Sequence, residues 1–125
     1  MPIRYVYVLA VATLLGCASA SSSGARREPN VITEQDIAAI PVTNAYDAIE
    51  RLRPLFLRSR GKTSINTPGT QYATVYVDGV RYGDLNSLKN ILASHVFDIR
   101  HYNGAEAQSK FGLQNTAGVI EVRMK

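Results

Sequence analysis

The chain has 125 residues, of which 46% are hydrophobic and 19% charged, and its formal net charge is +4 at pH 7. This length predicts a single domain, and the composition is ordinary for a folded globular protein. The basic excess is typical of a solvated surface and does not indicate nucleic-acid binding, since no base-stacking motif accompanies it. The positive residues are scattered, apart from Arg51, Arg53, Arg58, Arg60 and Lys62.

The first segment predicts a signal peptide over residues 1–16. One positive charge, Arg4, precedes an apolar run over residues 5–16. At a helical rise of 1.5 Å per residue this run spans about 18 Å, which is short of a bilayer core of about 30 Å. The pattern therefore favours a cleaved signal over a transmembrane helix.

Two cleavage sites compete. Leu14-Leu15-Gly16-Cys17 resembles a bacterial lipobox, in which the cysteine thiol is acylated, whereas Ala18-Ser19-Ala20 suits ordinary signal peptidase. We favour the lipobox because Cys17 is the one cysteine of the chain and occupies the required position. Cys17 is then the predicted lipidation site. We expect a palmitate-bearing anchor in the cell outer membrane, with the protein facing the periplasm; the alternative is a soluble periplasmic protein.

Residues 17–30 are rich in Ser, Ala and Gly and predict a flexible tether. A short strand at Val31-Ile32 and a helix capped by Thr33 and Asp36 should follow. A second helix, capped by Thr43 or Asn44, should run to about Arg53. Its apolar face has residues at i, i+3, i+4 and i+7, namely Ala45, Ala48, Ile49 and Leu52. Residues 55–60 are expected to lead as a strand into Gly61, before a polar loop over residues 62–71.

The last third of the chain predicts most of the sheet. Strands over residues 73–77 and 80–82 flank Asp78-Gly79, a strong signal for a tight turn. A short helical turn with Leu85, Leu88 and Ile91 facing the core should follow, and then a buried strand over residues 96–102 that includes Phe97. A small helix over residues 104–110 should end at a left-handed Gly112. The final strand, over residues 118–125, should alternate Ile120, Val122 and Met124 inward with Glu121, Arg123 and Lys125 outward.

Together these elements predict an α+β fold for residues 31–125, with a small mixed sheet of about four to five strands and short helices. Their order resembles the plug domain of TonB-dependent outer-membrane receptors. The matching pieces are Val77-Asp78-Gly79-Val80, residues 96–100, residues 105–112 and Gly118-Val119-Ile120-Glu121-Val122. The residues that carry this structural motif are Asp78, Gly79, Gly112 and Gly118.

The resemblance implies a plug-like, receptor-associated module that binds a receptor or barrel protein. A complete receptor continues into a barrel of about 22 strands of about 10 residues each, and the sequence ends at Lys125. Residues 18–30 also show no clear energy-coupling box. We therefore do not infer gated uptake from the resemblance to receptor plugs. We expect a non-enzymatic outer-membrane lipoprotein that acts as a protein-interaction module. The alternative is a periplasmic small-ligand-binding domain linked to outer-membrane uptake.

No pattern in the sequence indicates catalysis. The two histidines, His95 and His101, match no usual metal-ligand pair, and the turn accounts for Asp78. Glu106 and Glu121 lack a partner for paired-carboxylate chemistry, and phosphate-binding loops and nucleophile elbows are absent from the sequence. We expect no enzyme activity, cofactor, metal or nucleic-acid partner. Tyr72 and Tyr82, near the turn, are the candidates for an exposed binding face.

Overall fold

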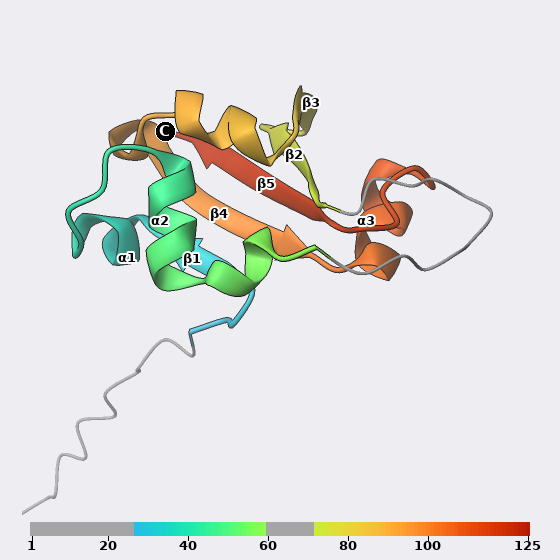
Figure 1. The fold of residues 1–125 in the computed structure, drawn as a ribbon, viewed down its shortest axis with the longest axis horizontal. Coiled ribbons are helices and arrows are strands. Elements are labelled where there is room, and N and C mark those ends of the chain that lie inside the picture. Colours follow the sequence, from blue (N-terminus) through green and yellow to red (C-terminus); the bar gives the residue numbers. More distant parts are fainter. Residues whose placement is uncertain (1–26, 60–71) are drawn as a thin grey trace, which may run out of the picture.

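The computed structural model describes residues 27–59 and 72–125. The predicted signal peptide, Cys17 and most of the predicted tether lie outside these residues. The described residues form one mixed five-stranded sheet in the order β1-β4-β5-β2-β3 (Figure 1). Neighbouring strands are antiparallel except β2 and β5, which are parallel. The strands are β1 (Val31–Thr33), β2 (Thr74–Val77), β3 (Val80–Gly83), β4 (Val96–Tyr102) and β5 (Val119–Met124).

Short helices connect these strands, which confirms the predicted α+β class. The α-helices are α1 (Glu34–Ala38), α2 (Ala45–Leu52) and α3 (Gly104–Phe111). The 3-10 helices are η2 (Pro54–Leu57), η3 (Leu85–Asn90) and η4 (Ala93–His95). Among the described residues no helix is long and apolar enough to cross a membrane.

Local capping chemistry fixes where the α-helices begin. The predicted capping box of Thr33 and Asp36 is present at α1. Asn44, rather than Thr43, caps α2, because its side-chain oxygen accepts the backbone N–H of Asp47 at 2.9 Å. A second capping box, formed by Asn103 and Glu106, starts α3.

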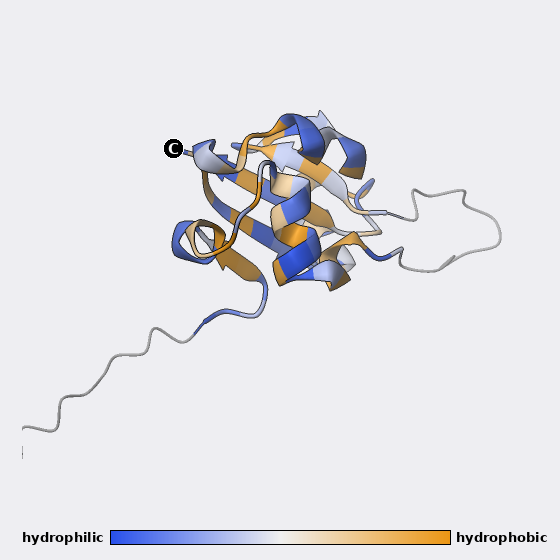
Figure 2. Cartoon of the chain, turned by 60° about the vertical axis from the view of Figure 1, so that its left-hand side comes forward, coloured by the Kyte–Doolittle hydropathy of each residue, from blue (hydrophilic) through white to orange (hydrophobic). Residues whose placement is uncertain are grey.

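The core lies on one face of the sheet, under α2 and η3. Ile49 of α2 and Leu88 of η3 are fully buried there against the strands. Figure 2 shows α2 lying across the sheet, with apolar and polar residues alternating along it. The strands contribute Ile32, Val75, Val96, Ile99, Ile120 and Val122 to this core.

The strand predicted over residues 55–60 is wrong where the structure describes it. Pro54 instead starts the 3-10 helix η2 and turns Phe56 into the core. The fixed φ of proline is already close to the helical value, which favours a helical turn at this position.

Predictions for three single residues also need correction. Phe97 is 47% exposed, because a bulge between Val96 and Asp98 interrupts the alternation of β4. Glu121, expected to point into solvent, is buried. Gly112 has a positive φ of 104° as predicted, but its ψ of 161° is extended rather than left-handed helical.

Candidate binding surfaces

Strand β3 forms one edge of the sheet. It pairs with β2 through Tyr76↔Arg81 and Val77↔Val80, and the described residues place no strand on its other side. The predicted tight turn joins the two strands, with φ of 48° at Asp78 and 83° at Gly79. Two consecutive positive φ angles are the geometry that suits a two-residue hairpin. The turn prediction is thus confirmed.

The side chain of Asp78 also ties this hairpin to the middle of the sheet. Its Oδ1 accepts the backbone N–H of Met124 at 3.0 Å, and its own N–H donates to the carbonyl of Val122 at 3.0 Å. Asp78 therefore positions the β2–β3 hairpin against the end of β5. The turn motif alone did not predict this structural role of the carboxylate, because Asp78 and Met124 are 46 residues apart in the sequence.

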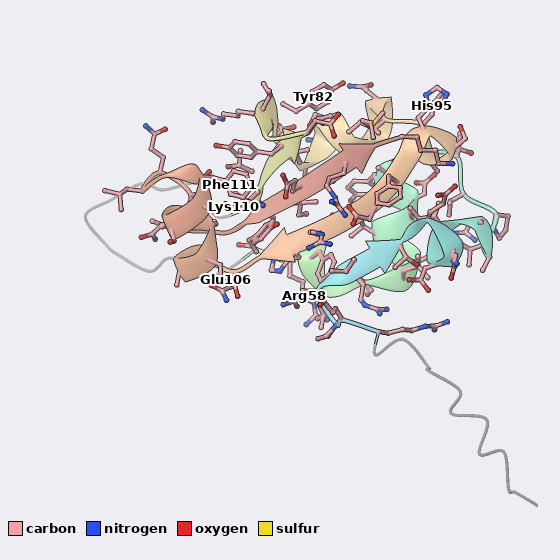
Figure 3. All side chains as sticks on the ribbon, turned by 180° about the vertical axis from the view of Figure 1, so that it is seen from behind. Arg58, Tyr82, His95, Glu106, Lys110 and Phe111 are labelled. Atoms are coloured by element: carbon pink, nitrogen blue, oxygen red, sulfur yellow. The ribbon has the colours of Figure 1, made fainter. Side chains whose placement is uncertain are left out.

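The outer edge of the hairpin exposes apolar side chains. Val80 is 70% exposed and Tyr82 is 48% exposed, and Figure 3 shows Tyr82 at the rim of the molecule. Tyr72 is exposed as well, and it lines the same open groove, of about 580 Å³, as Tyr82, Arg81 and Asp84. The structure thus brings together the two tyrosines that the sequence proposed for a binding face. Asp84 is engaged as the cap of η3, since its Oδ1 accepts the N–H groups of Asn86 and Ser87.

The sheet face opposite the core carries a row of paired charges. Asp98 of β4 is 5% exposed and accepts hydrogen bonds from Arg123 and from Arg100, the latter at 3.3 Å. Burial alone would raise the pKa of Asp98, but the bonds from the two arginines outweigh it and hold that pKa below its usual value. Asp98 is therefore an ionised structural anchor at neutral pH.

A second polar cluster lies where α3 covers the end of this face. Lys110 Nζ lies 2.7 Å from the Tyr102 hydroxyl and 3.0 Å from Glu121 Oε2, and the Tyr102 hydroxyl donates to Glu121 at 2.9 Å. The hydrogen bond with Tyr102, followed by the contact with Glu121, raises the pKa of Lys110. A lysine held in its protonated form is a poor nucleophile or base, so this triangle is suited to packing rather than to catalysis. Figure 3 shows Lys110 beside Phe111 on the same helix.

An open groove of about 590 Å³ runs beside this cluster, between β1, β4 and α3. Its lining includes Arg100, His101, Tyr102, Glu106 and Lys110. Most of these groups already have protein partners: Arg100 pairs with Asp98, Glu106 caps α3, and His101 stacks on Phe56 at 4.7 Å between ring centroids. The groove therefore contains several polar side chains, but few of them are uncommitted.

The motif glycines are structural. Gly118 has a φ of 99°, and a Cβ there would lie 2.6 Å from the carbonyl oxygen of Tyr102. Gly104 was not predicted as special, yet a Cβ there would lie 2.3 Å from the carbonyl oxygen of Thr116. Both residues allow close backbone contacts at the base of α3. In the described ranges, His, Cys, Asp and Glu form no group of three that could hold a metal ion.

No protein-family model matches this chain, and neither the curated proteins nor the solved structures include a significant match. The likeness to TonB-dependent receptor plugs thus rests on the sequence motifs and stays a prediction.

Proposed function

We propose that this chain is a non-enzymatic lipoprotein of the outer membrane, whose plug-like domain binds a partner protein through the edge strand β3. The observation that carries the proposal is the edge itself: β3 is paired on one side among the described residues, and Val80 and Tyr82 are exposed on it. Natural proteins usually blunt such edges with charges or proline. Here the strand Val80-Arg81-Tyr82-Gly83 has one charge and no proline, and a bulge at Tyr82 is its one irregularity of pairing with β2.

An exposed edge of this kind suits the addition of an extended segment from another protein. The free backbone groups supply hydrogen bonds, and alternate side chains supply specificity. Val80 and Arg81 are consecutive on β3 and therefore point to opposite faces, whereas Tyr82 is the extra residue of a bulge between the Val75↔Gly83 and Tyr76↔Arg81 pairs, where the alternation is interrupted. The partner segment should therefore place an acidic residue near Arg81 and apolar residues near Tyr82. The resemblance to receptor plugs favours a receptor or barrel protein as the source of this segment.

The experiment that tests this role is co-purification from detergent-solubilised outer membranes. We expect a partner to be retained by the wild-type chain and lost from Val80→Lys and Tyr82→Lys, because a charge in the added strand's path blocks pairing. Leu113→Lys is the matched control, since Leu113 is exposed but lies in the segment that follows α3. Equal retention by all three variants would contradict a role for β3.

The anchor has its own test. Cys17→Ser should abolish labelling by radioactive palmitate and release the protein to the soluble periplasm. A wild-type protein that carries no lipid and begins at Ser21 would show that the ordinary cleavage site is used.

Binding of a small ligand is the second candidate, and the groove beside α3 favours it. Arg100, His101 and Lys110 all line that groove. We rank it second because most of these groups are engaged within the protein. A ligand whose binding shifts the amide resonances of α3 but not those of β3 would reverse this order.

A further inference from the structure

The η2 turn presents an exposed leucine among arginines. Leu55 is 65% exposed, with Arg51 and Arg53 before it and Arg58 after it. Arg51 and Arg58 are exposed as well. From Arg51 to Val77 the sequence contains no acidic residue. This stretch includes the one basic cluster that stands out in the sequence, and the proposed binding at β3 does not use it.

The same turn lies where the chain enters the domain from its N-terminal tether. Arg53 Nε donates to the carbonyl of Pro29 at 3.3 Å, so the residues before β1 run against the junction of α2 and η2. Figure 3 shows Arg58 at this edge of the molecule. Arg27 is also exposed here, but Asp36 partly neutralises it at 3.8 Å. Arg53 is engaged as well, since its Nη1 donates to the carbonyl of Leu52 at 2.8 Å, so the exposed positive charge around Leu55 is that of Arg51 and Arg58.

This combination fits the interface of an anionic bilayer. Guanidinium groups bind phosphate oxygens through paired hydrogen bonds, and a single apolar side chain among them can enter the boundary between headgroups and acyl chains. A nucleic-acid site of this size would normally add an exposed aromatic ring for base stacking. The one aromatic residue of η2, Phe56, instead points into the core. The chemistry thus favours lipid phosphates.

We propose that η2, with Leu55 between the exposed Arg51 and Arg58, docks on the anionic phospholipid headgroups of the membrane. The inference rests on the proposed lipid anchor, because residues 17–26 span at most about 36 Å between Cys17 and the described domain. Docking there gives the domain a fixed orientation. The tether enters at β1, one edge of the sheet, so β3 at the other edge points away from the lipid.

The chain contains no tryptophan, so one introduced tryptophan reports on a single position. We would reconstitute the acylated full chain carrying Leu55→Trp in vesicles of phosphatidylcholine, with or without phosphatidylglycerol. We expect the emission to shift to the blue, and to be quenched by brominated lipid, only when phosphatidylglycerol is present. Leu113→Trp is the matched control because Leu113 is 81% exposed and lies outside η2. Its emission should not change.

Adding Arg51→Gln and Arg58→Gln to the Leu55→Trp chain should lower the ratio of docked to undocked protein by about 30-fold. Both residues are exposed, so the fold should be retained. Emission from Trp at position 55 that stays equal to that at position 113 in phosphatidylglycerol vesicles would overturn the proposal. So would a response to a DNA duplex that exceeds the response to vesicles.

Mass spectrometry of the same sample separates this inference from the anchor on which it rests. A sample that is not acylated at Cys17, yet shows the shift with added anionic vesicles, would support docking by η2 and contradict the lipid anchor. An acylated sample without the shift would support the lipid anchor and contradict docking by η2.

Discussion

At the scale of single residues, backbone geometry distinguishes two glycines that look equivalent in the sequence. Gly112 and Gly118 both have positive φ, at 104° and 99°. Around Gly112 an added Cβ meets nothing within 4 Å, whereas at Gly118 it meets the carbonyl oxygen of Tyr102 at 2.6 Å. The first site is constrained by its dihedral angle alone, and the second by its dihedral angle and by a backbone contact.

We therefore expect Gly118→Ala to destabilise the domain more than Gly112→Ala. Strain in φ should cost about 1 to 3 kcal/mol at either position, and the clash at Gly118 adds to it. Urea unfolding of the two variants measures the difference. Equal midpoints would show that the strand β5 can shift to relieve the contact with Tyr102.

From the ion pairs of Asp98 with Arg100 and Arg123 we predict how the stability of the domain depends on pH. Because the pKa of Asp98 is lowered in the folded state, its contribution is fully present above the unfolded-state value of about 3.9 and is lost as the pH falls through the folded value. Asp98→Asn should cost about 1 to 3 kcal/mol at neutral pH. It should also flatten the loss of stability on acidification below about pH 4. Urea unfolding across pH tests this, with the exposed Glu50→Gln as the charge-matched control.

At the scale of elements, α3 is held by side chains that reach from its last turn to the sheet. The Phe111 ring lies 4.5 Å from that of Tyr76 and 5.4 Å from that of Tyr102, measured between centroids. Lys110 lies over the Tyr102 ring at 4.4 Å and pairs with Glu121. These contacts form a small cluster on the face of the sheet opposite the core.

Phe111→Ala should loosen α3 and leave the core intact. The lost aromatic contacts should cost about 1 to 3 kcal/mol. Hydrogen exchange should quicken in Gly104–Phe111 while β4 and β5 remain protected. Phe97→Ala, on the same face but 47% exposed, should have a smaller effect. A uniform loss of protection in both variants would mean that α3 unfolds together with the sheet.

Local signals predicted the elements that depend on neighbouring residues. The cap at Thr33, the turn at Asp78-Gly79 and the helical spacing of α2 involve contacts within a few positions, and each appears in the structure. Positions set by distant partners were missed. The bulge that exposes Phe97 depends on pairing with β5, and Glu121 is buried because Tyr102 and Lys110 reach it.

For the candidate binding surfaces, too, local features were predicted from the sequence and features that depend on distant partners were not. Exposure of Tyr72 and Tyr82 followed from their place beside a turn. That β3 is an edge strand required the parallel pairing of β2 with β5, which places β3 at the end of the sheet. No local pattern in the sequence encodes that order.

At the scale of the whole molecule, the two edges of the sheet have different surroundings. Residues 27–30 and the junction of α2 and η2 lie near β1, and the exposed hairpin lies at β3 (Figure 1). Asp78 links the hairpin to β5, so the edge is held by the central part of the sheet. The arrangement suits a domain that faces a membrane on one side and a partner protein on the other.

Photo-crosslinking in living cells tests most directly whether a partner protein binds at β3. A photoreactive phenylalanine analogue replaces Tyr82 in the full chain, and replaces Leu113 in a matched control. We expect one defined adduct from position 82, mapped by mass spectrometry to an extended segment of a single protein, and we expect its loss when Val80→Lys is added. Adducts that form equally at positions 82 and 113, or that survive Val80→Lys, would contradict binding at this edge.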